Sequence, residues 1–408
     1  MKIIVQKFGG TSVRDENGRK HARNHIESAL DKGYKVVVVV SAMGRKGDPY
    51  ATDTLLSLIQ SSDRLISNRE TDLLLSCGEI ISSVVFCDML LSEGIRATAL
   101  TGAQAGFVTN NDHTNAKIIN MKCDRLLNEL NHYDVVVVAG FQGQTKFGDI
   151  TTIGRGGSDT SAAALGAAIN AEYIDIFTDV EGIMTADPRL AENARPLSVV
   201  TYAEVCNMAY QGAKVIHPRA VEIAQQANVP IRIRSTYSDH QGTLITNNQQ
   251  DHIIKERTVT GIAHLSNITQ LKVFAKKEQY NLQSEVFKAM ANHRISVDFI
   301  NISPNQVIYT VSDEMTNKAI SVLQDLGYNP VIERDCAKVA VVGAGMAGVP
   351  GVTSKIVGTL SQNGIRILQS ADSHTTIWIL VKQEDLVSAI NSLHDVFELE
   401  KVNLIDVN

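Results

Sequence analysis

The sequence predicts an α/β protein in which a layered domain with a mostly parallel sheet is followed by two smaller α+β units. Short β-branched runs alternate with helical stretches over residues 1–245, and several of those runs are wholly apolar. Residues 259–408 contain an internal repeat. With 408 residues the chain is also long enough for two or three domains.

Six strands are expected in the first unit. They are residues 3–5, 35–40, 95–100, 135–139, 174–178 and 230–234. The valine runs at 35–40 and 135–139 have no polar alternation, which is typical of strands buried on both faces of a parallel sheet. Residues 73–91 and 160–169 have helical periodicity. Strands that alternate with helices indicate a three-layer αβα domain.

The second half begins with a change in composition. Residues 246–258 are polar and lack apolar periodicity, so they are predicted to be a linker. Two later stretches, starting at Leu271 and Ala337, align with one four-residue insertion, and after it Ile295 corresponds to Ile365. Each copy is predicted to run strand, helix, strand, strand, helix. The copies are expected to pair, because small sheets leave an edge and a face uncovered.

These observations divide the chain into four parts. The predicted parts are a layered α/β domain at 1–245, a linker at 246–258, and two repeats at 259–335 and 336–408.

Charge and cysteine content exclude several classes of protein. The net charge of −6 and pI near 6.0 argue against a general nucleic-acid binder. The five cysteines have no C-x-x-C spacing, so we expect neither a disulfide framework nor a zinc site, and a reducing, cytoplasmic compartment fits best. The wholly apolar runs fall short of the roughly 20 residues of a membrane span. Met1 leads directly into a strand-like run, so no signal peptide is expected.

A glycine-rich turn follows the first expected strand, in the stretch VQKFGGTSV at 5–13. Gly9 and Gly10 would let the backbone approach a ligand closely. Lys7 could add a positive charge, and the helix start that follows would attract phosphate. The stretch is not a Walker loop, and a purely structural turn is the alternative.

A second turn of this kind occurs in TTIGRGGSDTSAAALGAA at 151–168. Arg155 lies inside the turn, and Ser158 and Asp159 begin an alanine-rich helix. Two glycine-rich helix starts in one α/β domain favour a shared anionic ligand.

Two further segments carry polar residues near expected strand ends. In FTDVEGIMTADPR (177–189), Thr178 and Asp179 end a strand, and ligands of parallel sheets collect at such ends. Arg189 adds a cation in the loop that follows, although a plain turn would explain this segment too. In GAKVIHPRA (212–220), Lys214 could reach phosphate, whereas a lone histidine before proline, His217, is more often structural.

Two single residues complete the first unit. Ser41 follows the valine run at a strand end. Glu79 is a carboxylate in an otherwise apolar helix and needs a partner if it is buried. A substrate ammonium would be a natural partner, and a solvent-facing position is the alternative.

The segment Gly343–Gly348 matches G-x-G-x-x-G between a strand-like run and a helix. A dinucleotide fold needs several βα units, and the first repeat has the same layout without these glycines. A tight turn before a helix is therefore the preferred interpretation, and a pocket for a small carboxylate is the alternative.

Taken together, these residues make the chain resemble the aspartokinases of the amino-acid kinase family. The motifs KFGGTS, VSAMG, S-x-G-E with Glu79, GRGGSDTSA, TDVEGIMTADPR and GAKVIHPRA occur in family order. The tandem repeat is similar to the paired ACT domains, which have a ferredoxin-like fold, and the closest likeness is to the diaminopimelate-sensitive isozymes of Gram-positive spore formers.

The resemblance implies that MgATP and L-aspartate react to give ADP and 4-phospho-L-aspartate, the first step toward lysine, diaminopimelate, threonine and methionine. It implies Mg²⁺ carried by ATP, no organic cofactor and no metal ligand from protein side chains. The physical interpretation agrees, because a carboxylate nucleophile with a pKa near about 4 needs no general base. Positioning and charge neutralisation would then supply the catalysis.

The resemblance also assigns roles by motif. Lys7 and Asp159 would act at the transferring phosphoryl group. ATP would be held by Lys7, Gly9, Gly10, Thr178, Asp179, Met184, Arg189, Lys214 and Val215. Aspartate would be held by Ser41, Thr52, Glu79, Arg155 and Ser158.

The regulatory half departs from the commonest family pattern, with Ile302 where many relatives have glutamine and QSADSHTT at 369–376. This favours an amino-acid effector other than the lysine–threonine pair, in a pocket made by Asp298, Asn301, Ser370 and Asp372. Exposed edges of the repeats predict a homodimer or a higher homo-oligomer.

The alternatives to an aspartate kinase are a kinase for another acid such as glutamate, an NAD-dependent dehydrogenase using the Gly343 turn, and an inactive amino-acid sensor.

Overall fold

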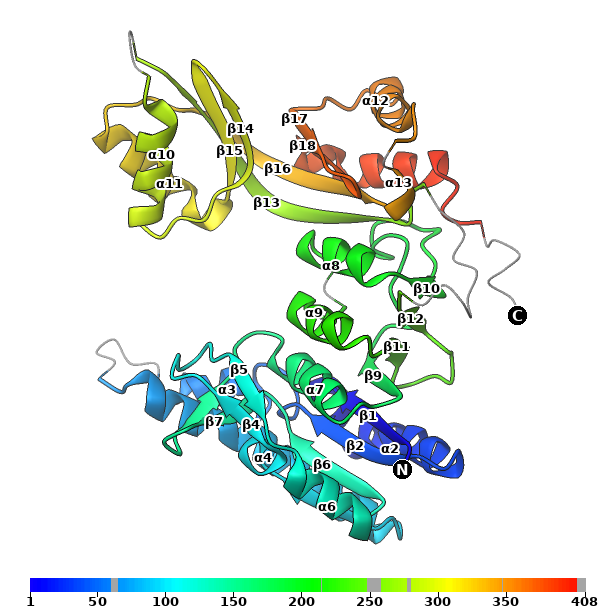
Figure 1. Cartoon of the computed structure of the whole chain (residues 1–408). Helices are drawn as coiled ribbons and strands as arrows, with labels where there is room; N and C mark the ends of the chain where they lie inside the picture. The colour runs from blue at the N-terminus through cyan, green and yellow to red at the C-terminus, as the bar shows by residue number, and fades with distance from the viewer. Residues whose placement is uncertain (60–64, 214, 248–257, 277–279, 347, 402–408) are drawn as a thin grey trace.

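The computed structural model describes all residues except 60–64, 214, 248–257, 277–279, 347 and 402–408. The chain forms two halves that lie one above the other in Figure 1, with the amino terminus in the lower half. The predicted linker 246–258 lies mostly outside the described residues.

The amino-terminal half is built on an eight-stranded sheet. Its order is β10 (Val199–Val200), β12 (Thr243–Ile245), β11 (Ile231–Ser235), β9 (Tyr173–Thr178), β1 (Ile3–Phe8), β2 (Lys35–Val40), β6 (Val135–Ala139) and β3 (Ala97–Leu100). Neighbouring strands run parallel except for β11 and β12. All six predicted strands are present, and the mostly parallel sheet is confirmed.

Helices cover both faces of this sheet. They are α1 (Gly10–Val13), α2 (Glu16–Asp31), α3 (Thr52–Ser57), α4 (Asn68–Ser92), α5 (Gly102–Ala105), α6 (Asp124–His132), α7 (Gly157–Ala168), α8 (Tyr202–Tyr210) and α9 (Pro218–Ala227). Val36 and Val38 pack with α2 and α4, whereas Val37 and Val39 belong to the core on the other face, which also contains residues of α6, α7 and α9. The apolar strands are thus buried on both faces, as the three-layer prediction requires.

A small second sheet, absent from the sequence prediction, lies beside α4. Its order is β5 (Ile118–Met121), β4 (Phe107–Thr109), β7 (Gln142–Thr145) and β8 (Ile150–Thr152). These strands are only three or four residues long, too short for periodicity to mark them. They matter because β8 leads directly into the turn that carries Arg155.

The long helix α4 is apolar enough, by length and composition, to cross a membrane. It packs instead against β2, β3, β6 and β8 of its own domain, and it buries Asp72 and Glu79 there. These contacts are those of a core helix.

The carboxyl-terminal half contains the predicted repeat. The first copy is β13 (Gly261–Phe274), α10 (Leu282–Asn292), β14 (Asp298–Ser303), β15 (Gln306–Ser312) and α11 (Asp313–Asp325). The second is β16 (Val331–Val342), η1 (Ala344–Met346), α12 (Val352–Gln362), β17 (Gln369–Asp372), β18 (Thr376–Lys382), η2 (Gln383–Asp385) and α13 (Leu386–Val396). The strand–helix–strand–strand–helix order of both copies is confirmed.

The two copies share one antiparallel sheet, with the order β14-β15-β13-β16-β18-β17. The long central strands β13 and β16 pair with each other and serve both copies. Each has one residue in the left-handed region, Asn267 at φ 59° and Asp335 at φ 53°, where the register of the pair is irregular. Pairing of the copies, as expected from the sequence, therefore occurs within one chain.

The Gly343 turn packs the two halves together. A Cβ on Gly343 would lie 2.3 Å from the carbonyl oxygen of Thr258, so only glycine allows this approach. The amide of Ala344 donates to the Glu204 carboxylate on α8 at 3.3 Å. Because the surrounding sheet is antiparallel, it lacks the parallel βαβ units of a dinucleotide fold, and the dehydrogenase alternative is not supported.

Candidate active site

Three strand ends meet at one edge of the large sheet. Strands β9, β1 and β2 are neighbours and parallel, with Phe8 opposite both Val40 and Phe177. Gly9, Ser41 and Thr178 therefore come together at the carboxyl ends of these strands, where ligands of parallel sheets bind.

The two glycine-rich turns converge on this edge. The ammonium of Lys7, at the end of β1, lies 2.7 Å from the carboxylate of Asp159 in the first turn of α7. Both side chains are about one-eighth exposed, at 13% and 14%, so the pair is reachable but largely shielded from solvent. A shielded ion pair of this kind can orient its ammonium toward an anionic ligand.

The first turn is shaped by close backbone contacts. A Cβ on Gly10 would lie 2.6 Å from the carbonyl oxygens of both Ala42 and Gly44, so only glycine lets this turn pack against the loop after β2. Gly9 borders the Lys7 ammonium, 3.5 Å from where its Cβ would be. Ser12 is fully buried and its hydroxyl bonds to Thr236 at 2.7 Å, so it has an internal role.

The second turn leaves the start of α7 open. Gly156 is the N-cap, with φ 71°, and no side chain caps the helix. Ser158 is buried in the first turn, whereas Arg155 is exposed and makes no ion pair with any residue that the structure describes. The uncapped amides and the free guanidinium both favour an anionic ligand.

His217 supports this turn from α9. Its ring accepts a hydrogen bond from the Arg219 amide at 3.3 Å and caps the helix. Its own amide faces the Asp159 carboxylate at 3.4 Å. Burial lowers the pKa of His217. These contacts support the structural role that the sequence favoured.

Glu79 is a buried carboxylate with a free oxygen. The side chain is 2% exposed, and its Oε1 accepts from the Ala42 amide at 3.1 Å. Its Oε2 has no hydrogen-bond partner among the described residues. Burial raises the pKa of Glu79 to about 8. An unpaired buried carboxylate fits a cationic ligand, because the cation would offset the cost of burying the charge.

Thr52 begins α3 close to the helix that carries Glu79. A Cβ on Gly78 would lie 3.0 Å from the carbonyl oxygen of Tyr50 and 3.3 Å from Leu55, which shows how tightly this segment packs on α4. Thr52 is half-buried there.

At the carboxyl end of β9, Asp179 forms an ion pair at 3.0 Å with Arg45 from the loop after β2, and the Thr178 hydroxyl donates to Asp179 at 3.2 Å. Arg45 was missed by the sequence analysis. Its only signal was a cation in the loop that follows VSAMG.

The remaining residues that were expected to bind ATP make no contact with Lys7 within the described part of the chain. Met184 bridges to Pro196, and Arg189 pairs with Asp187 of its own turn at 2.7 Å while its side chain is 85% exposed. Val215 is half-buried before α9. Lys214 lies outside the described residues.

The expected effector residues lie on β14 and β17. Asp298 pairs with the buried ammonium of Lys338, and Gln369 donates to the carbonyl oxygen of Phe299 at 2.5 Å. Asp298 and Ser370 thus flank one contact between the two edge strands. Asn301 and Asp372 are exposed on the same strands.

The raised pKa of Glu79 predicts how the binding of a cationic ligand depends on pH. An ammonium bound by Glu79 requires the ionised carboxylate, so for the aspartate that the resemblance implies, KM should fall by up to about tenfold per pH unit toward pH 8 and then level off. The folded state also holds this proton more tightly than the unfolded chain. Glu79 therefore makes its full contribution to the stability of the fold below pH 4.5, and this contribution is lost as the pH rises through about 8.

Steady-state kinetics between pH 6.5 and 8.5 would check this. Glu79→Gln should raise the aspartate KM and remove its slope with pH, while the ATP KM stays the same. An unchanged slope in the variant would show that another group titrates.

Comparison with known proteins places these features in a family. Residues 2–235 match the Amino acid kinase family, and residues 331–395 match the ACT domain. Aspartokinase 1 of Bacillus subtilis (strain 168) is 67% identical over 404 residues, which covers 98% of this chain and 100% of that protein. Aspartokinase of Geobacillus stearothermophilus is 40% identical over 407 residues, which covers 98% of both chains.

Solved structures agree. Aspartokinase III of E. coli in complex with aspartate and ADP (R-state) has a TM-score of 0.76 and 26% identity, covering 97% of this chain and 99% of that chain. The same enzyme in complex with lysine and aspartate (T-state) has a TM-score of 0.76 and 27% identity, covering 96% and 99%. The chain therefore belongs to the aspartokinases of the amino acid kinase family, which makes it a phosphotransferase with a carboxyl group as acceptor.

Proposed function

We propose that the chain transfers the γ-phosphoryl group of MgATP to the side-chain carboxylate of L-aspartate, giving ADP and 4-phospho-L-aspartate. The observation that carries this proposal is the Lys7–Asp159 pair, formed where two glycine-rich turns meet. Glu79, which keeps an oxygen without a partner among the described residues, binds the amide of Ala42 in the loop against which the first turn packs. The aspartate and ADP bound in the E. coli enzyme support it. The product would feed lysine, diaminopimelate, threonine and methionine synthesis in the cytoplasm.

Lys7 neutralises the transferring phosphoryl group in this proposal. Asp159 orients the Lys7 ammonium through the 2.7 Å ion pair, and Gly9 and Gly10 let the nucleotide approach the backbone. The aspartate nucleophile is ionised at neutral pH, with a pKa near about 4, so no general base is needed. Positioning and charge stabilisation supply the catalysis.

The two ends of the amino-acid substrate are held by opposite charges. Arg155 binds the α-carboxylate through its planar guanidinium, and Glu79 binds the α-ammonium. Ser41, Thr52 and Ser158 supply hydrogen bonds around them. Support comes from the exposed, unpaired state of Arg155 among the described residues and from the free Oε2 of Glu79.

The rest of the nucleotide would lie along the carboxyl end of β9. We assign this part of the site to Thr178, Asp179, Met184, Arg189, Lys214 and Val215. Arg189 forms an ion pair with Asp187 in the structure, so its guanidinium would have to leave this pair to reach a phosphate.

Mg²⁺ fits this site as an ion held mainly by the nucleotide. The carboxylates at the sheet edge, Asp159 and Asp179, are each paired with a cation, Lys7 and Arg45. This donor set leaves little for a metal site made by protein alone, and Mg²⁺ commonly binds through substrate phosphates. When bound, the ion supplies further charge neutralisation on the phosphoryl oxygens.

An assay that couples ADP release to a detectable reaction tests the activity. With MgATP and L-aspartate, ADP should form at a rate that saturates with aspartate, and L-glutamate should give at least about 10²-fold lower kcat/KM. Equal rates with glutamate would assign the chain to another acid. ADP release with neither acid would contradict the kinase proposal.

We further propose that the carboxyl-terminal half regulates this activity. Residues 259–335 and 336–408 act as paired ACT domains joined to the catalytic domain 1–245 by the linker 246–258. Asp335, the last residue of the first ACT domain, has a left-handed conformation within β16, which supports this division. An amino-acid effector would bind near Asp298, Asn301, Ser370 and Asp372, and the lysine-bound E. coli enzyme supports effector binding of this class. The coupled assay with lysine, threonine and meso-diaminopimelate, alone and combined, would identify the effector, and no change with any of them would contradict the proposal.

A homodimer through the regulatory half is the assembly we propose. Strand β14 lies at the edge of the sheet and exposes Ile300 and Ile302, at 46% and 59%. Exposed apolar edges of this kind invite pairing with another chain. A molar mass of 44.4 kDa in light scattering would contradict the dimer.

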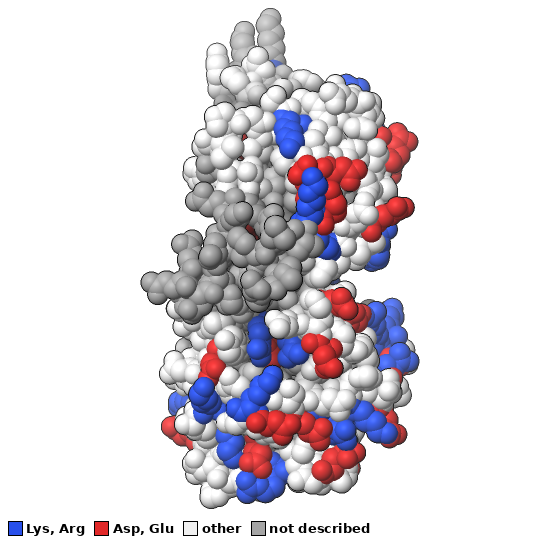
Figure 2. Space-filling model, turned by 90° about the vertical axis from the view of Figure 1, so that its right-hand side faces the viewer, with Lys and Arg blue, Asp and Glu red and all other residues white. Residues whose placement is uncertain are grey.

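The face in Figure 2 shows both signs of charge interspersed, without the continuous basic area of a nucleic-acid binder.

A further inference from the structure

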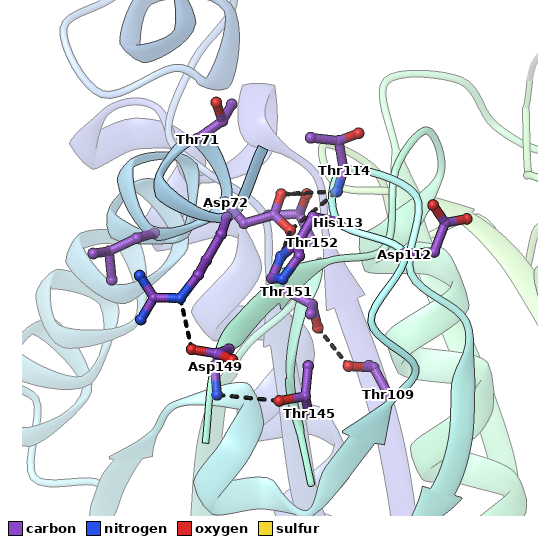
Figure 3. A network of polar contacts seen from close by, with 12 residues as sticks. Thr71, Asp72, Thr109, Asp112, His113, Thr114, Thr145, Asp149, Thr151 and Thr152 are labelled. Carbon is purple, nitrogen blue, oxygen red and sulfur yellow. Dashed lines mark hydrogen bonds and ion pairs between the residues drawn. The ribbon is translucent and has the colours of Figure 1, made fainter. Parts of the chain in front are cut away.

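Asp72, near the start of α4, has a completely buried carboxylate that binds three partners (Figure 3). It accepts from the His113 ring at 2.9 Å, from the Thr152 hydroxyl at 2.5 Å, and from the Thr114 amide at 3.1 Å on one oxygen and 3.0 Å on the other. Burying a carboxylate is costly unless such partners surround it. Neither the sheet contacts of α4 nor the roles proposed above account for this cost.

One of these partners is strained. Thr114 has φ 73°, a left-handed conformation that is a genuine outlier for a β-branched residue. Such backbone persists only where its surroundings hold it, and it is frequent at functional sites. Both oxygens of Asp72 accept from the Thr114 amide, so Asp72 contributes directly to holding the loop in this conformation.

The strained loop in turn supports the turn that carries Arg155. The amide of Ala116 donates to the carbonyl oxygen of Thr152 at 2.9 Å. A Cβ on Gly154 would lie 3.2 Å from the Thr114 carbonyl oxygen and 3.0 Å from the Asn115 side chain. Thr152 is also bound directly to Asp72. The segment entering the Arg155 turn is therefore fixed to Asp72 both directly and through the loop.

Asp72 is linked to Glu79 through the helix that carries both residues. The two residues are seven positions apart on α4, so they lie on the same face, about 10 Å apart along the helix axis. Gln142, at the start of β7, donates to the carbonyl oxygen of Ser76 between them at 2.9 Å. Any slip of α4 relative to the small sheet would break these contacts and move Glu79 relative to Arg155.

We propose that Asp72 is a positioning residue that sets the separation between Glu79 and Arg155. It does so by fixing α4 to β8 and to the 113–115 loop. This separation matters because the α-ammonium and the α-carboxylate of one small substrate must reach both groups at once. The inference rests on the proposed roles of Glu79 and Arg155 and adds a residue that does not itself touch substrate.

The test uses Thr152, because it can lose one bond to Asp72 without burying an unpaired charge. Thr152→Val removes the hydroxyl at nearly constant size, and Thr152→Ser keeps it. Thr109→Val is the matched control, since it breaks the buried Thr109–Thr151 hydroxyl pair, 2.6 Å long, in the same small sheet. Steady-state kinetics and thermal unfolding are measured for all three, and also for Asp72→Asn if it folds.

Thr152→Val should raise the aspartate KM by about tenfold, because small displacements of positioning groups have large effects, and change the ATP KM less than about twofold. Thr152→Ser should restore the aspartate KM. Thr109→Val should lower the melting temperature by a similar amount without changing the aspartate KM.

Two outcomes would overturn the inference. One is an aspartate KM that stays unchanged in Thr152→Val, and the other is a parallel rise in both KM values. If the proposed role of Arg155 itself is wrong, Arg155→Lys leaves the aspartate KM unchanged, so this failure can be told apart from failure of the positioning role. If Arg155→Lys raises that KM and Thr152→Val does not, only the positioning role of Asp72 is lost.

Discussion

Replacing Lys7 with methionine is expected to lower kcat by about 10²- to 10³-fold, the usual loss when one group that stabilises transition-state charge is removed. Methionine has a similar length but no charge. It would leave the Asp159 carboxylate, now 2.7 Å from the Lys7 ammonium, unpaired and facing the phosphates. Like charges repel, so the negative phosphoryl group would be destabilised as well as unsupported.

The measurement is kcat from the coupled ADP assay at saturating aspartate and ATP. Lys20→Met is a matched control, because Lys20 is an exposed lysine of α2 paired only with Glu16 in the described structure. It should keep full activity. A Lys7→Met enzyme that melts at the normal temperature and retains kcat within about threefold would show that Lys7 is not at the reaction centre.

Replacing Arg155 with lysine is expected to raise the aspartate KM by about 10- to 100-fold, with the ATP KM changed much less. Lysine keeps the charge but cannot form the paired hydrogen bonds of a guanidinium with a carboxylate. One hydrogen bond to a charged group is worth about 1.5–3 kcal/mol, which corresponds to this range of KM.

Initial rates over a matrix of aspartate and ATP concentrations would separate the two constants. Arg125→Lys offers a control, because Arg125 is an exposed arginine of α6 whose ion pair with Glu129 at 3.8 Å lies in another part of the domain. An unchanged aspartate KM in Arg155→Lys would refute the assignment of Arg155. An equal rise in both constants would instead place Arg155 on the nucleotide.

Much of the fold could be predicted because local patterns encode it. The valine runs that became β2 and β6 are wholly apolar since both faces of the sheet are covered by helices. The tandem repeat could be predicted because each copy must bury the same apolar face of the same small sheet. The strands β7 and β8 were not predicted, because three or four polar residues carry no periodic signal.

For the site, the sequence indicated which segments carry ligand-binding residues but not how these segments meet. Glycines and charges identified the turns around Lys7 and Asp159 because turns require particular residue types. Asp72 and Arg45 were missed, since a single charge in a helix or loop looks the same whether it is exposed or buried. Their importance depends on partners such as Thr152 and Asp179 that lie far away in the chain.

Local patterns in the chain therefore encode the layered domain, the repeated regulatory half and the residue types of the anion-binding turns, because periodicity and turn chemistry act over neighbouring residues. Folding brings Lys7 to Asp159, leaves Glu79 with an oxygen that no described residue binds, and makes β13 and β16 serve both repeats. Long-range contacts arise when whole helices and strands pack against one another, and the spacing of residues within one segment does not specify that packing.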